Sequence, residues 1–214
     1  LDAVAVSDGM GGHQAGEVAS KLAVDSIREM LLSNHTDAEA ALSSAFVEAN
    51  NAVHSRASQF DEMYGMGCTL VAAILRDNEF IAANIGDSRL YHFDGESIHQ
   101  ITHDHSFVAE LVRRGAITAE EAKTHPRRNL ITRAIGTEKR VPADIFSCEW
   151  KRDDMLLLCS DGLCGVLDDS EMAVYLQNCT DLDATCSALI ERALAAGSRD
   201  NITVVLVKND GGNA

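Results

Sequence analysis

The stretch Val4-Ala5-Val6-Ser7-Asp8-Gly9-Met10-Gly11-Gly12-His13 stands almost at the start of this 214-residue chain. Its apolar beginning, from Ala3 to Val6, predicts a short buried strand. The strand ends in the carboxylate of Asp8, and three glycines follow within four residues before a helical pattern begins. Glycine has no Cβ, so this turn lets backbone groups come close to a bound ion. The sequence therefore places Asp8 at a strand end, on a turn suited to a ligand.

The same pattern returns late in the chain. The run Met155-Leu156-Leu157-Leu158-Cys159 predicts a second buried strand, and Ser160-Asp161-Gly162 follows it directly. Three further aspartates stand in predicted turns: Asp87, Asp104 and Asp200. An aspartate in a turn usually caps its own backbone. Five of them in such places, with one motif repeated, favour a shared role instead.

Clustered carboxylates suggest a metal centre. Without His or Cys at metal-ligand spacing, such a cluster favours hard cations such as Mg²⁺ or Mn²⁺. Two such ions about 4 Å apart can hold a hydroxide between them and position a phosphoryl group for in-line attack. This reasoning indicates metal-assisted hydrolysis of a phosphoester.

The composition excludes several classes of protein. A net charge of -15 and a pI of about 4.8 argue against nucleic-acid binding, which requires patches of Lys and Arg. No apolar run approaches the roughly 20 residues of a membrane span. The six cysteines contain no C-x-x-C pair, so we expect buried, reduced thiols in a cytoplasmic protein.

The order of predicted elements indicates an α+β fold. Apolar residues at helical spacing predict one helix from Gln14 to Leu32 and another that begins at Thr36. The region 68–102 predicts strands joined by short turns, which is typical of an antiparallel meander. Short helices, two more strands, a helix pair and a closing strand at 202–208 follow. Helices and strands in blocks predict α+β layers.

Six stretches carry a specific resemblance. They are Val6-Ser7-Asp8-Gly9-Met10-Gly11-Gly12-His13, Met66-Gly67-Cys68-Thr69-Leu70, Ala83-Asn84-Ile85-Gly86-Asp87-Ser88-Arg89, Thr102-His103-Asp104-His105-Ser106, Ser160-Asp161-Gly162-Leu163 and Ser198-Arg199-Asp200-Asn201-Ile202-Thr203. In this order they resemble the successive motifs of the metal-dependent protein phosphatases, the PPM or type 2C family, of bacterial type. The similarity extends over essentially the whole chain.

The resemblance implies a four-layer α-β-β-α sandwich with two central antiparallel sheets. It also implies hydrolysis of phosphoserine and phosphothreonine in signalling proteins, opposing a serine/threonine kinase. Residues 1–208 would form the catalytic domain and 209–214 a tail. We expect a monomer that acts in the cytoplasm, without nucleic-acid or membrane partners.

The resemblance also assigns a metal site with two ions, Mg²⁺ or Mn²⁺. Asp8 would bridge them, and the Gly9 carbonyl would bind one of them. Asp161 and Asp200 would bind the other, and Asp104 with Asp161 would hold a third, weaker ion. A hydroxide bridging the metals would attack phosphorus directly, without a phosphoenzyme.

We also assign expected roles to three other parts of the chain. The basic segment with His125, Arg127 and Arg128 falls in the family's flap, near the expected position of a phosphopeptide. His13 has two interpretations: a general acid that protonates the leaving oxygen, or a histidine that caps or packs on the following helix. Asp87 is expected to be structural, with its neighbour Arg89 as partner.

The chain also departs from the family pattern. Members normally begin with two further strands, which carry an arginine that binds phosphate and an acidic residue that supports the metal site through water. This chain starts after them, so we expect an incomplete N-terminal edge and reduced activity. Losing a charged group that binds a phosphoryl group typically costs several kcal/mol of transition-state stabilisation.

Two alternative functions remain open. One is a non-catalytic domain of the same fold that binds phosphoproteins or regulatory partners. The other is a metal-dependent phosphoesterase that acts on small molecules. A dinucleotide site at Gly9-x-Gly11 is disfavoured because Gln14 occupies the position of the third glycine. Cys186 and Arg192 match a cysteine-phosphatase loop only in spacing, since they lie on a helical stripe.

Overall fold

The computed structural model describes residues 2–10, 13–32 and 37–211, with the backbone alone for residues 13 and 14. Two four-stranded antiparallel sheets form its centre. The first has the order β1 (Asp2–Val6), β4 (Leu70–Leu75), β5 (Glu79–Ile85) and β8 (Asp144–Glu149). The second has the order β10 (Val204–Lys208), β9 (Met155–Cys159), β6 (Arg89–Phe93) and β7 (Ile98–Gln100). A small ribbon pairs β2 (Gly9–Met10) with β3 (Gly67–Cys68).

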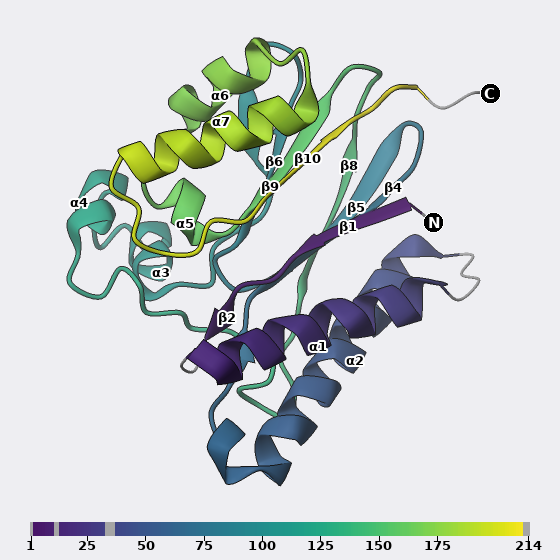
Figure 1. The fold of residues 1–214 in the computed structure, drawn as a ribbon, viewed down its shortest axis with the longest axis vertical. Coiled ribbons are helices and arrows are strands. Elements are labelled where there is room, and N and C mark those ends of the chain that lie inside the picture. The colour runs from purple at the N-terminus through teal and green to yellow at the C-terminus, as the bar shows by residue number, and fades with distance from the viewer. Residues whose placement is uncertain (1, 11–12, 33–36, 212–214) are drawn as a thin grey trace.

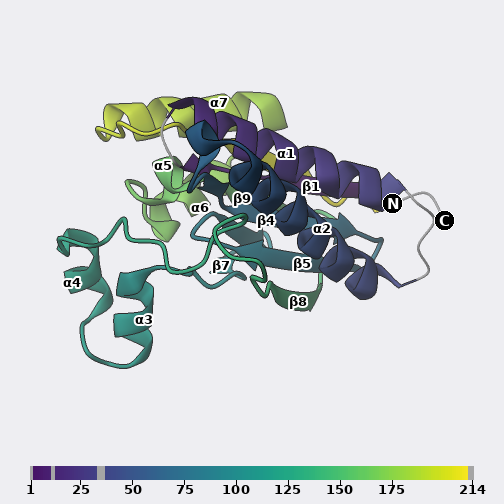
Figure 2. The same ribbon diagram turned by 90° about the horizontal axis from the view of Figure 1, so that it is seen from below.

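Helix pairs cover the outer faces of both sheets (Figure 1). The first sheet is covered by α1 (His13–Leu32) and α2 (Ala38–Gln59), and the second by α6 (Asp169–Gln177) and α7 (Leu182–Ala195). The remaining helical segments are η1 (Asp61–Met63), α3 (Phe107–Arg113), α4 (Ala119–Thr124) and α5 (Asp161–Cys164). Figure 2 shows that α3 and α4 stand away from the layers, on one side of the molecule.

Three separate cores confirm the predicted four layers. Side chains alternate across a strand, so β4 supplies Leu70 and Ala72 to the core under α1 and α2, and Val71 to the core between the sheets. The third core joins the second sheet to α6 and α7 through residues such as Leu157 and Leu189. The structure is therefore the α+β sandwich that the sequence predicts.

One topological prediction is wrong. The hairpins β4–β5 and β6–β7 form as expected, but β5 and β6 belong to different sheets, so the region is not a continuous meander. The chain crosses between the sheets at Gly86-Asp87-Ser88. Gly86 has a φ of +112°, and a Cβ there would lie only 2.7 Å from the Thr69 side chain. A crossing of this kind and a hairpin turn look alike in a short glycine-containing sequence.

Asp37 caps α2, since its carboxylate accepts hydrogen bonds from the amides of Glu39 and Ala40; the predicted start at Thr36 lies outside the described residues. Asn209 is buried, and its side chain donates to the Asp77 carbonyl at 2.9 Å.

Within the described ranges, the helices are all too short or too polar to cross a membrane.

Candidate metal centre

Asp8 and Asp161 are brought together from opposite sheets. Asp8 follows β1 of the first sheet, and Asp161 begins α5 directly after β9 of the second. Each carboxyl group affects the pKa of the other, so the two side chains lie close together. Asp200 lies in the loop between α7 and β10. Its charge raises the pKa of both Asp8 and Asp161. Three of the predicted metal ligands are therefore neighbours in the structure.

The electrostatics of these groups are unfavourable in isolation. Burial, and after it the nearby charges of Asp161 and Asp200, together raise the pKa of Asp8 from 3.8 to about 7. The pKa of Asp161 is also raised, first by burial and then by the charge of Asp200. Burying like charges together disfavours ionisation of each of them. A cation placed among them would reverse this effect, since it compensates the charges directly.

One atom shows that the site fits a cation. Asp161 Oδ1 is buried and has no hydrogen-bond partner among the described residues. Such orphaned oxygens are costly and therefore rare in folded proteins. Across the described ranges, no three His, Cys, Asp or Glu side chains surround one point as closely as metal ligands do. The residues therefore suit an ion by their charge and by the unmet bonding capacity of this oxygen, while their separation is wider than that of metal ligands.

Hydroxyl groups fix the turn of Asp161 against the loop of Asp200. Ser160 Oγ donates to the Asn201 carbonyl at 3.1 Å and accepts from the Thr203 amide at 3.0 Å. Ser198 Oγ donates to the Gly162 carbonyl at 2.8 Å. Gly162 is required here because a Cβ would overlap the Asn201 carbonyl oxygen. Three hydrogen bonds thereby join the turn that carries Asp161 to the loop that carries Asp200.

Thr69 positions Asp8 in the same way. Its Oγ1 accepts the Asp8 amide at 2.9 Å, while its own amide donates to the Asp8 carbonyl at 2.8 Å. On the other side of the turn, a Cβ on Gly9 would overlap the carbonyl of Gly16, so α1 packs directly against this backbone. The glycine-rich sequence therefore allows a close contact between the turn and the helix.

Asp104 has a different environment from the one expected. Arg89 Nε donates to its Oδ1 at 2.9 Å, and Arg89 Nη2 donates to its Oδ2 at 2.7 Å. Gln100 Nε2 also donates to Oδ1, at 3.1 Å. The predicted pair between Asp87 and Arg89 is wrong, because this arginine bonds Asp104 instead. Asp104 nevertheless lies close enough for its charge to act on Asp161.

Asp87, which the sequence led us to expect as a structural residue, lies in the same region. It lies among the same carboxylates, since the charges of Asp161, Asp104 and Asp8 all act on it. Like Asp8 and Asp161, it stands just beyond the end of an apolar strand, which is the pattern that groups it with them in the sequence. Its Gly-Asp-Ser setting suggested an ordinary turn instead.

The predicted flap residues gather around Phe107, at the start of α3. The Arg127 guanidinium lies 4.2 Å from the centre of the Phe107 ring, and the His125 ring lies 5.8 Å from it. Arg128 is exposed, and its guanidinium forms no ion pair or ring contact with any described residue. His13 begins α1, but its side chain lies outside the described residues.

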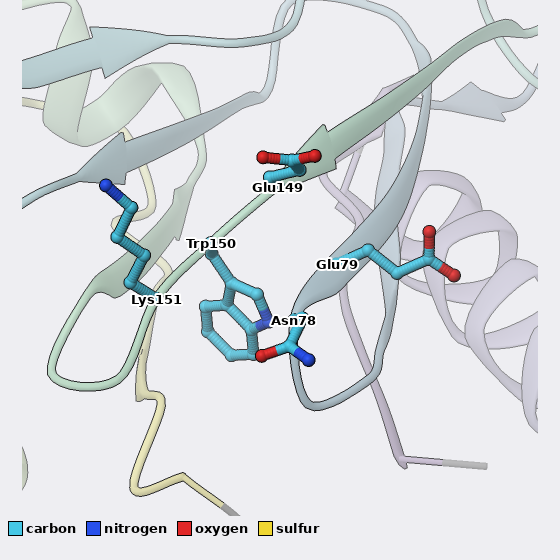
Figure 3. A pocket seen from close by; sticks show the side chains of 5 residues that line it. All are labelled: Asn78, Glu79, Glu149, Trp150 and Lys151. Atoms are coloured by element: carbon cyan, nitrogen blue, oxygen red, sulfur yellow. The ribbon is translucent and has the colours of Figure 1, made fainter.

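A surface hollow of about 410 Å³ lies elsewhere (Figure 3). It is lined by Asn78, Glu79, Glu149, Trp150 and Lys151. Glu79 begins β5, whereas Asp87 follows the other end of that strand, so the hollow and the carboxylates lie at opposite ends of the first sheet. The hollow therefore contributes nothing to the carboxylate site.

Comparison with known proteins defines the class as protein phosphatases. Residues 1–202 match the family model described as protein phosphatase 2C. The serine/threonine phosphatase stp of Listeria monocytogenes serovar 1/2a is 41% identical over 212 residues, which are 97% of this chain and 84% of that protein. The chain belongs to the protein phosphatase 2C family.

Solved structures agree with this assignment. The crystal structure of serine/threonine phosphatase Stp1 from Staphylococcus aureus superimposes with a TM-score of 0.91 at 40% identity, covering 96% of this chain and 83% of that one. The catalytic domain of the serine/threonine protein phosphatase PstP, in complex with two manganese ions, gives a TM-score of 0.87 at 36% identity. That match covers 95% of this chain and 86% of the PstP chain.

Proposed function

We propose that this protein hydrolyses phosphoserine and phosphothreonine in proteins, with Mg²⁺ or Mn²⁺ held by Asp8, the Gly9 carbonyl, Asp161 and Asp200. The observation that carries the proposal is the neighbouring pair Asp8 and Asp161, with raised pKa values and one buried oxygen that has no partner among the described residues. The two manganese ions in the PstP structure support the choice and number of ions.

When bound, ions of this kind lower the pKa of water so that it can attack phosphorus, and they neutralise charge on the phosphoryl oxygens. The chain's own residues provide the geometry. Thr69 fixes the orientation of Asp8, while Ser160 and Ser198 join the turn of Asp161 to the loop of Asp200. By the family resemblance, water would attack phosphorus directly, without a covalent phosphoenzyme. Asp104 contributes to a third, weaker site beside Asp161.

The flap supplies the preference for protein substrates. Arg127 is held over Phe107, and Arg128 leaves its charge exposed on the same segment. A free guanidinium suits a phosphate or an acidic peptide, because it donates several hydrogen bonds in a fixed fork. The substrates are then proteins that a serine/threonine kinase has phosphorylated, and the chain acts as a monomer. His13 as the proton donor to the leaving group remains a prediction.

The test compares two substrates and one site variant. Turnover of p-nitrophenyl phosphate and of a phosphothreonine peptide is measured with Mn²⁺ and with EDTA, and we expect Mn²⁺-dependent turnover of both. Asp161→Asn should abolish both turnover and Mn²⁺ binding measured by calorimetry. Asp25→Asn is the matched control, because Asp25 is an exposed aspartate on α1 paired with Lys21.

The alternatives give distinct results. Mn²⁺ binding without turnover of either substrate would favour a non-catalytic domain that binds phosphoproteins. Turnover of small esters but never of phosphopeptides would favour a small-molecule phosphoesterase. Wild-type Mn²⁺ binding by Asp161→Asn would contradict the ligand assignment.

A further inference from the structure

Asp87 is a buried carboxylate that has no cationic partner among the residues the structure describes. It occupies the crossing between the two sheets, and only 9% of its surface is exposed. Within the described ranges, its own backbone amide is the one donor that acts on its carboxyl group. The neighbouring cation, Arg89, is already bonded to both oxygens of Asp104. A buried charge left in this state is unfavourable unless something else compensates it.

The backbone of this turn is fixed on both sides. Gly86 and His105 exchange two hydrogen bonds: the Gly86 amide donates to His105 Nδ1 at 3.1 Å, and the His105 amide donates to the Gly86 carbonyl at 2.9 Å. Since Nδ1 accepts, the neutral His105 ring carries its hydrogen on Nε2, which donates to Asp144 Oδ2 at 3.1 Å. Burial lowers the pKa of His105, which favours this neutral form.

The other side of the turn is joined to Asp8. Ser88 Oγ and Thr69 Oγ1 lie 2.7 Å apart, and Thr69 Oγ1 also accepts the Asp8 amide. Asp87 is therefore connected through its neighbours to Asp104 on one side and to Asp8 on the other. Its position among the acidic residues is determined by a network of short bonds.

A second buried aspartate shows what a purely structural role looks like. Asp154 is 6% exposed, and its Oδ2 lies 2.8 Å from His92 Nε2 and accepts the Lys151 amide at 2.8 Å. No comparable donor to Asp87 is found in the part of the chain that the structure describes. Instead, burial, and after it the charges of Asp161, Asp104 and Asp8, together raise the pKa of Asp87 from 3.8 to about 7. The two aspartates are equally buried but differ in what surrounds them.

We propose that Asp87 is a further acidic residue of the metal centre, whose charge helps to hold the cations through the water molecules that they carry. Mg²⁺ and related ions usually retain several waters in protein sites, so an acidic residue can act on them without direct contact. Asp87 is then a positioning residue. This inference rests on the metal-dependent function proposed above.

The experiment uses Asp87→Asn, with Asp154→Asn as the matched control. Mn²⁺ affinity is measured by calorimetry, and thermal unfolding is followed in EDTA and in Mn²⁺. We expect Asp87→Asn to weaken Mn²⁺ binding by about tenfold, as changes outside the direct ligands of a metal typically do. Its Tm in EDTA should stay the same or rise, because one uncompensated charge has been removed. Asp154→Asn should instead lower the Tm in EDTA and leave the Mn²⁺ affinity unchanged.

Asp87→Glu keeps the charge and should recover most of the affinity that Asp87→Asn loses. Wild-type Mn²⁺ affinity in Asp87→Asn, or failure of that variant to fold in EDTA, would overturn the inference in favour of a structural role. Absence of Mn²⁺ binding by the unaltered protein would overturn the proposed function and this inference with it.

Discussion

Arg89 holds both carboxylate oxygens of Asp104, at 2.9 Å from Oδ1 and 2.7 Å from Oδ2. The two side chains are only 24% and 14% exposed. Asp161, by contrast, has an oxygen with no partner among the described residues. The two residues that the family resemblance assigns to one ion therefore differ in what they do for the metal-free protein. Asp104 belongs to an ion pair, whereas Asp161 has an unmet bonding capacity.

Asp104→Asn should destabilise the metal-free protein strongly. Removing one partner of a buried ion pair leaves the other charge uncompensated, which costs on the order of 3 kcal/mol. Urea unfolding in EDTA measures this cost. Asp161→Asn, in the same assay, should have little effect or increase stability. Equal losses of unfolding free energy in both variants would contradict the distinction.

The metal-free protein should become less stable as the pH rises from 5.5 to 8. The pKa values of Asp8 and Asp87 are raised to about 7 in the fold, so the folded chain binds these protons more tightly than the unfolded chain does. Their stabilising contribution is complete below their ordinary value of 3.8 and is lost as the pH rises through about 7.

Thermal unfolding in EDTA across this pH range checks the sign. With saturating Mn²⁺ the trend should reverse, because the ions compete with the protons for the same carboxylates. A Tm that rises with pH in EDTA would show that other groups dominate the titration.

Thr69→Val should weaken both the fold and the metal site. The valine is close in shape to threonine but leaves the Asp8 amide and the Ser88 hydroxyl without their shared partner. An unsatisfied buried donor costs about 1–3 kcal/mol. Urea unfolding gives the loss of stability, and calorimetry should show weaker Mn²⁺ binding. Thr69→Ser, which keeps the hydroxyl, is the control and should retain most of both.

Arg128→Ala should raise KM for a phosphopeptide more than for p-nitrophenyl phosphate. Its guanidinium is exposed, whereas that of Arg127 is held over Phe107. Arg127→Ala should therefore raise KM for the peptide as well, but by disturbing the flap. Arg28→Ala, on the exposed face of α1, is the control for loss of positive charge. Equal changes in KM for both substrates would remove the flap from peptide recognition.

Much of the fold and part of the site could be predicted from local patterns. The strand at Met155–Cys159 and the helix at Leu182–Ala195 follow from apolar spacing, which reports burial directly. The repeated strand-to-aspartate step identified Asp8 and Asp161, and these two residues do meet in the structure.

The errors concern partners that lie far away in the sequence. Nothing local indicates that β5 and β6 join different sheets, because a crossing needs the same turn residues as a hairpin. The partner of Arg89 is 15 residues away, so proximity in the chain suggested Asp87 instead. The expectation that Asp87 is structural rested partly on that pairing, since a neighbouring arginine would have compensated its charge.

The centre lies where the two sheets end, with Asp8 contributed by the first and Asp161 by the second. A cation between them would act as a cross-link between two halves that are otherwise joined by an apolar core. Ligands that bind only the folded state stabilise it by RT ln(1 + [L]/Kd), about 2.7 kcal/mol when the ligand is at 100 times its Kd. The lifetime of this protein in the presence of proteases would therefore follow the concentration of free divalent cation around it. Scarcity of the cation would then lower the amount of protein as well as its activity.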